Sequence, residues 1–190
     1  RIQRAHSVLV LLPDLANPFF STILEGISRN LSKHGYSMLI ASTKQVHDSG
    51  ERLIDYLDDA RADGMIILDG GLDTEVVEML ENAPQSKRIL FACEWIDGAS
   101  FASVRCQNRQ GSRTAVNHLY DLGHRKIAHV TGPKGNVLML SRKDAFVAEI
   151  EKLKLELKPE WVIAGDFSLA AGCLAAQKWL ALNDRPTAVF

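Results

Sequence analysis

Residues 8–31 constrain the fold of this 190-residue chain more than any other segment, because they predict a strand, a loop and a helix in direct succession. Val8–Leu12 are all apolar, which is typical of a parallel strand covered on both faces, and Pro13 ends the run because proline lacks a ladder N–H. Asn17 suits a helix N-cap, and apolar residues then recur at helical spacing, namely Phe20, Ile23, Leu24, Ile27 and Leu31. We therefore expect a central strand and a packed helix, with Phe19 near the helix entrance.

The same order of helix, short apolar strand and polar loop recurs along the chain. Further strands are predicted at 36–41, 65–68, 87–93, 126–131, 160–164 and 187–190, with Gly35 and Gly123 at helix ends. The helices between them include segments within 49–63 and at 74–82, 111–122, 141–157 and 170–182. This alternation predicts an α/β fold with parallel sheets.

The alternation of helices and strands is interrupted at residues 97–110, where small residues predominate, and we expect a boundary between two domains there. The chain ends inside its last predicted strand. That strand has no following loop and gives its sheet only three members, so we expect the fold to be incomplete at the C-terminus.

Composition narrows the class of protein. With 46% hydrophobic and 24% charged residues the chain is an ordinary globular sequence, and its net charge of −1 provides no overall attraction to nucleic acid or anionic lipid. No apolar run reaches the roughly 20 residues needed to cross a bilayer, and no signal-peptide pattern follows the basic start, so we expect a cytoplasmic protein without membrane contact. Cys93, Cys106 and Cys173 lack Cys-x-x-Cys spacing, which argues against a disulfide framework or a zinc site. No metal or cofactor is predicted.

Candidate binding residues follow the predicted strands, because ligands of open α/β sheets bind beyond the carboxyl ends of the strands. The loops after the strands at 8–12 and 160–164 provide carboxylates, an amide and aromatic rings, namely Asp14, Asn17, Phe19, Phe20, Asp166 and Phe167. This mixture suits a polar, ring-shaped small molecule such as a sugar or a nucleoside. Loop capping and turn formation remain the alternative for each residue.

Enzyme signatures are missing: the sequence has no GxGxxG after its first strand, no GxxxxGK[ST] and no GxSxG. His118, His124 and His129 match no usual metal-ligand spacing. Arg142 opens a predicted helix, where a cation is electrostatically disfavoured. Its guanidinium either binds a ligand in the crevice or pairs with a surface acid such as Asp144 or Glu149.

These segments together resemble the effector-binding core of the LacI family of bacterial transcription repressors. The resemblance covers essentially the whole chain and rests on NPFF, LGHRKIAHVTGP, GDFSLAAG, RPTAVF and the placing of Arg142 four residues before Phe146. It implies two Rossmann-like lobes of the periplasmic-binding-protein-like I type, at 8–106 and, in part, 107–190, with residues 1–7 as the end of a linker. It also implies a homodimer that holds a small effector between its lobes. Operator DNA would be bound only through an N-terminal helix-turn-helix headpiece, which is absent here.

The resemblance also implies which residues contact the effector. It points to Arg142 as the residue that grips the effector, to Phe167 as the ring that stacks on it, and to the loop at 14–20 as one wall. Gln107 replaces the usual Asp of an Asp-Asn pair, and it keeps a donor and an acceptor while losing the charge. The expected effector is a nucleoside, a purine or a sugar. A transport-type sugar-binding protein and, less favoured, an enzyme on a doubly wound sheet are the alternative functions.

Overall fold

The computed structural model describes residues 4–49 and 52–190. Residues 1–3 of the predicted linker and residues 50 and 51 of the helix predicted within 49–63 lie outside this description. The chain forms two compact units that adjoin in sequence at Arg105 and Cys106, inside the segment 97–110. We describe each unit by itself.

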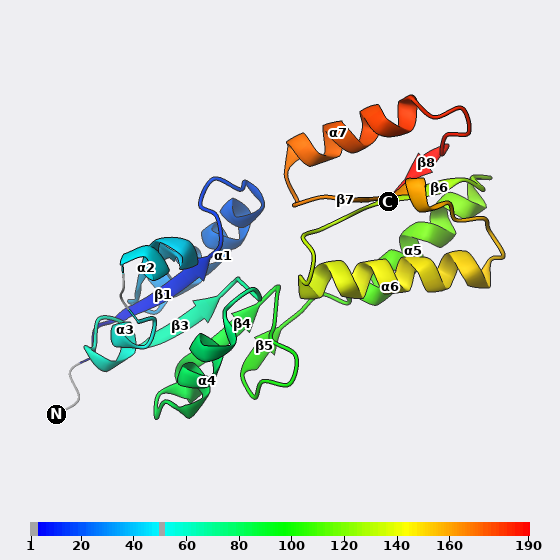
Figure 1. The fold of residues 1–190 in the computed structure, drawn as a ribbon. Coiled ribbons are helices and arrows are strands. Elements are labelled where there is room, and N and C mark those ends of the chain that lie inside the picture. The colour runs from blue at the N-terminus through cyan, green and yellow to red at the C-terminus, as the bar shows by residue number, and fades with distance from the viewer. Residues whose placement is uncertain (1–3, 50–51) are drawn as a thin grey trace. The chain divides into compact units, whose positions relative to one another are not determined.

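The first unit is built on a parallel sheet of five strands in the order β2-β1-β3-β4-β5 (Figure 1). The strands are β1 (Ser7–Leu12), β2 (Ser37–Ser42), β3 (Gly64–Ile67), β4 (Ile89–Ala92) and β5 (Ala102–Val104). Val10 of β1 is in register with Ile40 of β2 and with Ile66 of β3, so β1 has a neighbour on each side. The prediction of a central first strand is confirmed.

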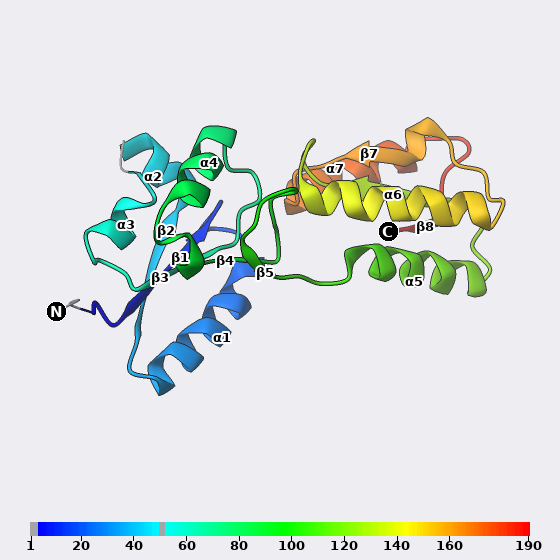
Figure 2. The same cartoon turned by 90° about the horizontal axis from the view of Figure 1, so that it is seen from below.

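Helices cover both faces of this sheet, as Figure 2 shows. Leu9 and Leu11 of β1 pack on the face covered by α2 (Thr43–Ser49), α3 (Asp55–Asp58) and α4 (Thr74–Asn82). Val10 and Leu12 point to the opposite face, where Phe20 of α1 (Phe19–Lys33) joins them. The unbroken apolar run of β1 follows from this burial on two sides.

The second unit has a parallel sheet of three strands in the order β7-β6-β8. These strands are β6 (Ile127–Thr131), β7 (Val162–Ala164) and β8 (Ala188–Val189). One face is covered by α5 (Asn108–Asp121) and α6 (Val137–Lys152), with Phe146 and Ile150 in the core, and α7 (Leu169–Leu180) packs on the other face (Figure 1). The predicted α/β fold with parallel sheets is confirmed in both units.

The start of α6 corrects one prediction. The sequence places this helix at 141–157, yet it begins at Val137, because the Asn136 side chain accepts hydrogen bonds from the backbone N–H groups of Leu138 and Met139. The expectation that Arg142 opens the helix is wrong, because it lies in the second turn. The helix is followed by Lys154 in the left-handed region, with φ of 55°.

The single helix predicted within 49–63 is also replaced. The described part of this region contains the one-turn helix α3 and only the last residue of α2, which begins at Thr43 directly after β2. The Asp55 carboxylate accepts hydrogen bonds from the backbone N–H and the guanidinium of Arg52, and so provides a local start for α3. Ser86–Arg88 and Pro159–Trp161 form single 3-10 turns before β4 and β7.

Candidate functional site

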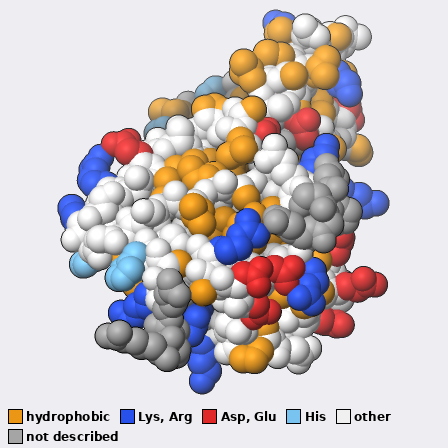
Figure 3. All heavy atoms as spheres, turned by 90° about the vertical axis from the view of Figure 1, so that its left-hand side faces the viewer, with side chains coloured by type: hydrophobic (Ala, Val, Ile, Leu, Met, Phe, Trp, Pro, Cys, Tyr) orange, Lys and Arg blue, Asp and Glu red, His pale blue; other side chains and the backbone are white. Residues whose placement is uncertain are grey.

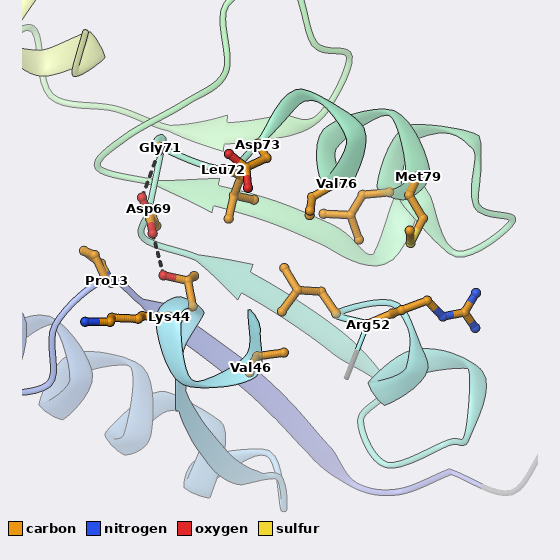
Figure 4. Close-up of a pocket in the computed structure, with 13 residues that line it drawn as sticks. Pro13, Lys44, Val46, Arg52, Asp69, Gly71, Leu72, Asp73, Val76 and Met79 are labelled. Atoms are coloured by element: carbon orange, nitrogen blue, oxygen red, sulfur yellow. Dashed lines mark hydrogen bonds between the residues drawn. The ribbon is translucent and has the colours of Figure 1, made fainter. Parts of the chain in front are cut away.

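A cavity of about 480 Å³ lies at the carboxyl ends of β2 and β3 in the first unit. Its lining includes Pro13, Thr43 and Asp69 from the strand ends, and apolar side chains from the helices and the loop before α3, namely Val46, Leu53, Val76, Met79 and Leu80. Figure 4 shows Val76 and Met79 of α4 facing Val46 of α2 across this space. The size of the cavity is within the usual range for a small-molecule site.

Three of the polar side chains that line this cavity have hydrogen-bond partners, namely Thr43, Asp69 and Arg52. One Asp69 carboxylate oxygen accepts from the Thr43 hydroxyl at 2.6 Å and the other from the Gly71 N–H at 2.8 Å, the two bonds drawn in Figure 4. Arg52, on the margin, donates to Asp55 at 2.6 Å, and this hydrogen bond lowers the pKa of Asp55. The Thr43 bond ties the start of α2 to the loop after β3, and the other two bonds are local, so all three have a structural role.

The predicted residues of the first unit lie in the loop after β1 and at the start of α1, and they do not line this cavity. The Asp14 carboxylate accepts from the Ala16 N–H at 2.8 Å, and the Asn17 side-chain oxygen accepts from the Phe19 N–H at 3.0 Å, so both order the loop before α1. Phe19 is 56% exposed, whereas Phe20 is 6% exposed and packs in the core against Phe19 with ring centroids 5.2 Å apart. Phe19 is therefore the ring of the pair that a ligand can reach.

Mixed charges characterise the surface of the first unit. On the face shown in Figure 3, Lys and Arg side chains lie among Asp and Glu side chains, and hydrophobic side chains gather in the middle of the face. Such alternation does not create the continuous basic surface by which proteins hold a nucleic-acid backbone.

A second cavity, of about 210 Å³, lies at the carboxyl end of β6 in the second unit. It brings together Arg142 and Phe167, which the sequence analysis names as effector contacts, and it adds a histidine and further residues, namely His129, Val130, Gly132, Met139 and Phe190. Gln107 and Asp166 are exposed and do not line this cavity.

Arg142 is held by a hydrogen bond within the second unit. Its Nε donates to the side-chain oxygen of Asn108 at 2.9 Å, and Asn108 is itself buried and donates to the Cys106 carbonyl at 3.1 Å. Among the described residues the two terminal nitrogens of the guanidinium have no hydrogen-bond or ion-pair partner. They can donate to a ligand, as guanidinium groups do in the recognition of carboxylates and other oxygen acceptors.

The alternative partners of Arg142 are occupied elsewhere. Asp144 lies 3.9 Å from Arg109, and Glu149 binds Lys152 at 2.7 Å and Asn117 at 3.0 Å. The last two hydrogen bonds lower the pKa of Glu149, which therefore remains ionised in its buried position between α5 and α6. The surface-pair explanation of Arg142 is wrong.

Phe167 is placed by an unusual backbone conformation in the loop between β7 and α7. Its φ is 66°, a value that non-glycine residues rarely adopt, and its side chain is 45% exposed. The ring lies against the backbone of Gly132, where any Cβ would overlap it. Asp166 stabilises this loop by accepting from the Ser168 N–H at 2.9 Å, and the hydrogen bonds from Ser168 lower its pKa.

His129 is the residue of this cavity that sequence reasoning missed. It lies in the middle of β6, is 4% exposed, and stacks with both Phe146 and Phe190, with centroid distances of 4.8 and 5.0 Å. Its spacing from the other histidines indicates no metal site, and among the described residues no group of His, Cys, Asp and Glu is arranged to hold a metal ion. The available signal was a single polar ring inside the apolar strand IAHVT.

Comparison with known proteins decides the family. Residues 5–190 match the family described as periplasmic binding proteins and sugar binding domain of LacI family. The chain belongs to this family. The resemblance on which the sequence analysis drew is confirmed, and with it the two-lobed, periplasmic-binding-protein-like fold class.

LacI-family repressors are among the similar proteins. The chain is 31% identical over 187 residues to the HTH-type transcriptional repressor CytR of Escherichia coli K12, covering 98% of this chain and 54% of that protein. It is 28% identical over 182 residues to the HTH-type transcriptional repressor PurR of Vibrio vulnificus, covering 95% and 54%. These relatives are transcriptional repressors, which are not enzymes.

The fold is similar to solved LacI-family structures as well. A LacI-family transcriptional regulator from Lactobacillus casei with bound sucrose aligns with a TM-score of 0.81 and 26% identity, over 97% of this chain and 68% of that one. The chain spans about half the length of the curated relatives it matches. Across residues 4–49 and 52–190, no helix is long and apolar enough to cross a membrane.

Proposed function

We propose that this chain is the effector-sensing part of a LacI-family transcriptional regulator. A small polar molecule, either a nucleoside, a purine or a sugar, binds to it and changes the affinity of the whole protein for operator DNA. The change arises because the effector binds one conformation of the protein more tightly than another. The whole protein acts as a homodimer in the cytoplasm, and its DNA contacts come from a headpiece outside this chain.

One observation carries this proposal: the cavity of the second unit combines an exposed aromatic ring with unused guanidinium donors. Phe167 offers a flat apolar face, and Arg142 offers two terminal nitrogens without partners among the described residues. A ring-shaped ligand with oxygen acceptors uses both groups at once. The Lactobacillus casei regulator, whose structure contains sucrose, supports a ligand of this class.

The predicted contacts outside this cavity belong to the same proposal. Phe19 supplies a second exposed aromatic ring, and Asp14, Asn17, Gln107 and Asp166 supply polar groups near strand or helix ends. Phe20 acts from the core, because it packs behind Phe19. Replacing Phe19 by Ala tests the first unit's share of the binding energy.

The transport-type sugar-binding protein remains the rival function, because it shares the fold. The polar groups of the second unit's cavity suit a sugar as well as a nucleoside, so the cavity alone does not distinguish a transport protein from a regulator. The similarity to CytR and PurR, both named transcriptional repressors, favours the regulator. Operator binding separates them, because only a regulator changes its DNA affinity when ligand is added.

A two-step experiment tests the proposal on the full-length protein. Thermal-shift and calorimetric screens of nucleosides, purines and sugars identify a ligand, and Arg142→Ala and Phe167→Ala should each weaken its binding by about 1–3 kcal/mol with little loss of fold. Arg109→Ala is the matched control, since Arg109 is half-exposed and pairs only distantly with Asp144. Unchanged affinity in both cavity variants would contradict the site.

The second step measures operator affinity with and without the ligand found in the first. We expect a change of about 5–150-fold, the usual range of allosteric coupling. Identical operator affinity at saturating ligand would refute sensing while leaving binding intact. Turnover of the bound ligand by the purified protein would instead support an enzyme.

A further inference from the structure

The side chain of Asn108 is a buried amide with a hydrogen bond at each end. Asn108 is the first residue of α5, which lies beside α6 (Figure 2), and it is 9% exposed. Its side-chain N–H donates to the Cys106 carbonyl at 3.1 Å, and its side-chain oxygen accepts from Nε of Arg142 on α6 at 2.9 Å. The amide therefore connects the start of α5 to an arginine that lines the cavity of the second unit.

The Cys106 carbonyl determines which way this amide faces. A carbonyl oxygen only accepts, so the NH₂ group of Asn108 points to Cys106 and the side-chain oxygen points to Arg142. The same carbonyl accepts from the backbone N–H of Asn108 at 2.9 Å, and the Ser112 hydroxyl donates to the Asn108 carbonyl at 3.1 Å. The acceptor that Arg142 meets is thus held in place by bonds to its own neighbours in the chain.

The bond to Asn108 limits the ways in which Arg142 can bind a ligand. A guanidinium presents two parallel N–H groups either from its side, with Nε and one terminal nitrogen, or from its end, with both terminal nitrogens. The bond from Nε to Asn108 occupies the side. The end remains for a ligand, and it suits two neighbouring oxygen atoms, such as those of adjacent hydroxyl groups on a sugar ring.

Asn108 acts on a ligand through Arg142 and not by direct contact. Of the described residues, Arg142 and Phe167 line the cavity of about 210 Å³, whereas Asn108 does not. The arginine side chain has one of the largest rotamer freedoms of all side chains, and ordering it on binding costs free energy. A hydrogen bond that orders the guanidinium beforehand removes part of this cost.

We propose that Asn108 is a positioning residue of the effector site, which holds the Arg142 guanidinium so that its two terminal nitrogens face the ligand. This inference rests on the proposed function, because Arg142 is the ligand contact through which Asn108 acts. The role requires an acceptor for Nε and a donor for the Cys106 carbonyl in one short side chain. Asparagine provides both groups, whereas aspartate provides only the acceptor and alanine provides neither.

A double-mutant cycle measured by calorimetry on the full-length protein tests this role, with inosine, uridine, glucose and sucrose as probes. We expect Asn108→Ala to weaken the probe that binds by about tenfold, which corresponds to about 1.4 kcal/mol. In the Arg142→Ala background the same substitution should change the affinity by less than about twofold, because no guanidinium remains to be positioned. Equal losses in the two backgrounds, or no loss in either, overturn the inference.

Asn117→Ala is the matched control, because Asn117 makes the same kind of hydrogen bond between the same two helices. Its side-chain N–H donates to Glu149 of α6 at 3.0 Å, and neither of these two described residues lines the cavity. Both alanine variants lose a bond between α5 and α6, but only Asn108→Ala should lower the ligand affinity. An equal loss of affinity in Asn117→Ala would assign the effect to helix packing and contradict positioning.

Asn108→Asp separates the two bonds of the amide. Aspartate keeps an acceptor for Nε of Arg142 and lacks the donor for the Cys106 carbonyl. All four probes are uncharged, so we expect Asn108→Asp to recover part of the affinity that Asn108→Ala loses. If Asn108→Asp binds no better than Asn108→Ala, the bond to Arg142 is not the one that matters and the inference fails.

Nitrogen-15 NMR of arginine-labelled wild-type protein provides a test that needs no folded variant at Asn108. The Nε–H of Arg142, assigned by its loss in Arg142→Lys, should be as rigid as the backbone before any probe is added. A mobile Nε–H in the wild type overturns the inference. This measurement decides the case if Asn108→Ala does not fold.

The outcomes distinguish this inference from the proposed function. If a probe binds and Arg142→Ala weakens it but Asn108→Ala does not, the role of Asn108 is refuted and the effector site stands. If no probe binds, or if Arg142→Ala and Phe167→Ala leave binding unchanged, the proposed site fails and the role of Asn108 fails with it.

Discussion

The two units each have a cavity at the carboxyl ends of parallel strands, yet the two cavities differ in how their polar groups are used. In the first unit the larger cavity is bordered by Asp69, whose two oxygens accept hydrogen bonds from Thr43 and Gly71. In the second unit the smaller cavity contains Arg142 and His129, which both have nitrogens without partners among the described residues. Of these two cavities the first has the larger volume, whereas the second has the arginine and the exposed aromatic ring that suit a polar, ring-shaped ligand.

This difference distinguishes polar groups with a structural role from polar groups that are free to bind a ligand. A carboxylate that already bonds a hydroxyl and an N–H gains little from a ligand, because each new bond replaces an existing one. A guanidinium nitrogen without a partner gains the full value of its first bond. The predictions that follow compare matched substitutions in the two units, beginning with the largest expected effect.

Removing a core ring should destabilise either unit strongly. Phe146→Ala in the second unit and Phe91→Ala in the first should each lower the free energy of unfolding by about 3–5 kcal/mol, because both rings are at most 1% exposed. Only Phe146 lies on the helix that carries Arg142, so at a temperature where both variants are folded only Phe146→Ala should also weaken ligand binding. Denaturant unfolding and calorimetry measure the two effects. Equal losses of ligand affinity in the two variants would contradict the assignment of the ligand site to the second unit.

Replacing a glycine that follows a strand by alanine should affect protein stability in one unit and ligand affinity in the other. Gly70→Ala brings a methyl group to 2.9 Å from the Trp95 carbonyl oxygen, a backbone atom that cannot easily move, and should destabilise by about 1–3 kcal/mol. In Gly132→Ala the three atoms nearest to the new methyl group belong to the exposed Phe167 ring, which can rotate away, so its stability should change less. The displaced ring no longer stacks, and the affinity should fall by roughly tenfold. If Gly132→Ala bound ligand normally, Phe167 would not be a contact.

Removing the bonded carboxylate of the first unit should affect stability without affecting binding. Asp69→Ala removes the hydrogen bond to Thr43 of α2 and the one to Gly71 within its own loop, and should lower the free energy of unfolding by about 1 kcal/mol, while ligand affinity stays at the wild-type value. Arg142→Lys should show the opposite behaviour, because lysine keeps the charge but lacks the fork of donors. A large loss of affinity in folded Asp69→Ala would assign the first cavity to the ligand.

The smallest expected effect is a dependence of stability on pH. The pKa of His129 is lowered in the folded protein relative to its value of about 6.5 in an unfolded chain, so protons bind the unfolded chain more readily. The stabilisation is complete above about pH 6.5 and is lost as the pH falls through the folded-state pKa. The charged groups that act on the ring are Lys143 and Arg142 of α6, and both lower the pKa of His129.

The measurement compares chemical denaturation of the wild type and His129→Phe at several pH values below neutrality. The difference in their free energies of unfolding should shift in favour of His129→Phe as the pH falls. A difference that is constant with pH would show that His129 titrates alike in the folded and unfolded protein.

Local pattern predicted the elements of this fold better than it predicted their ends. The run Val8–Leu12 identifies a buried central strand, because only a strand covered on both faces tolerates continuous apolar residues. The start of α6 was misplaced, since the apolar residues that follow Asn136 suit a loop end as well as a first turn. The cap that decides between them depends on a side-chain rotamer, which no periodicity reveals.

The candidate site was predicted in part for a similar reason. Arg142 and Phe167 were named from their motifs, and the structure adds that both line one cavity, although 25 positions separate them. His129 was set aside because it was considered only as a metal ligand. Its hydrogen-bond partner is the carbonyl of Phe190, which is distant in sequence and adjacent only because β6 and β8 pair.

The sequence by itself determined the α/β class, the parallel sheets, the central first strand and the family, because these depend on periodicity and on motifs carried by contiguous residues. The tertiary structure alone decided which polar atoms are already bonded and which are not. Asp69 and His129 look equally available in the sequence. In the folded protein Asp69 has two hydrogen-bond partners, whereas Nε2 of His129 has none among the described residues. Whether a polar atom has a hydrogen-bond partner depends on its neighbours in three dimensions, so a local sequence pattern cannot predict it.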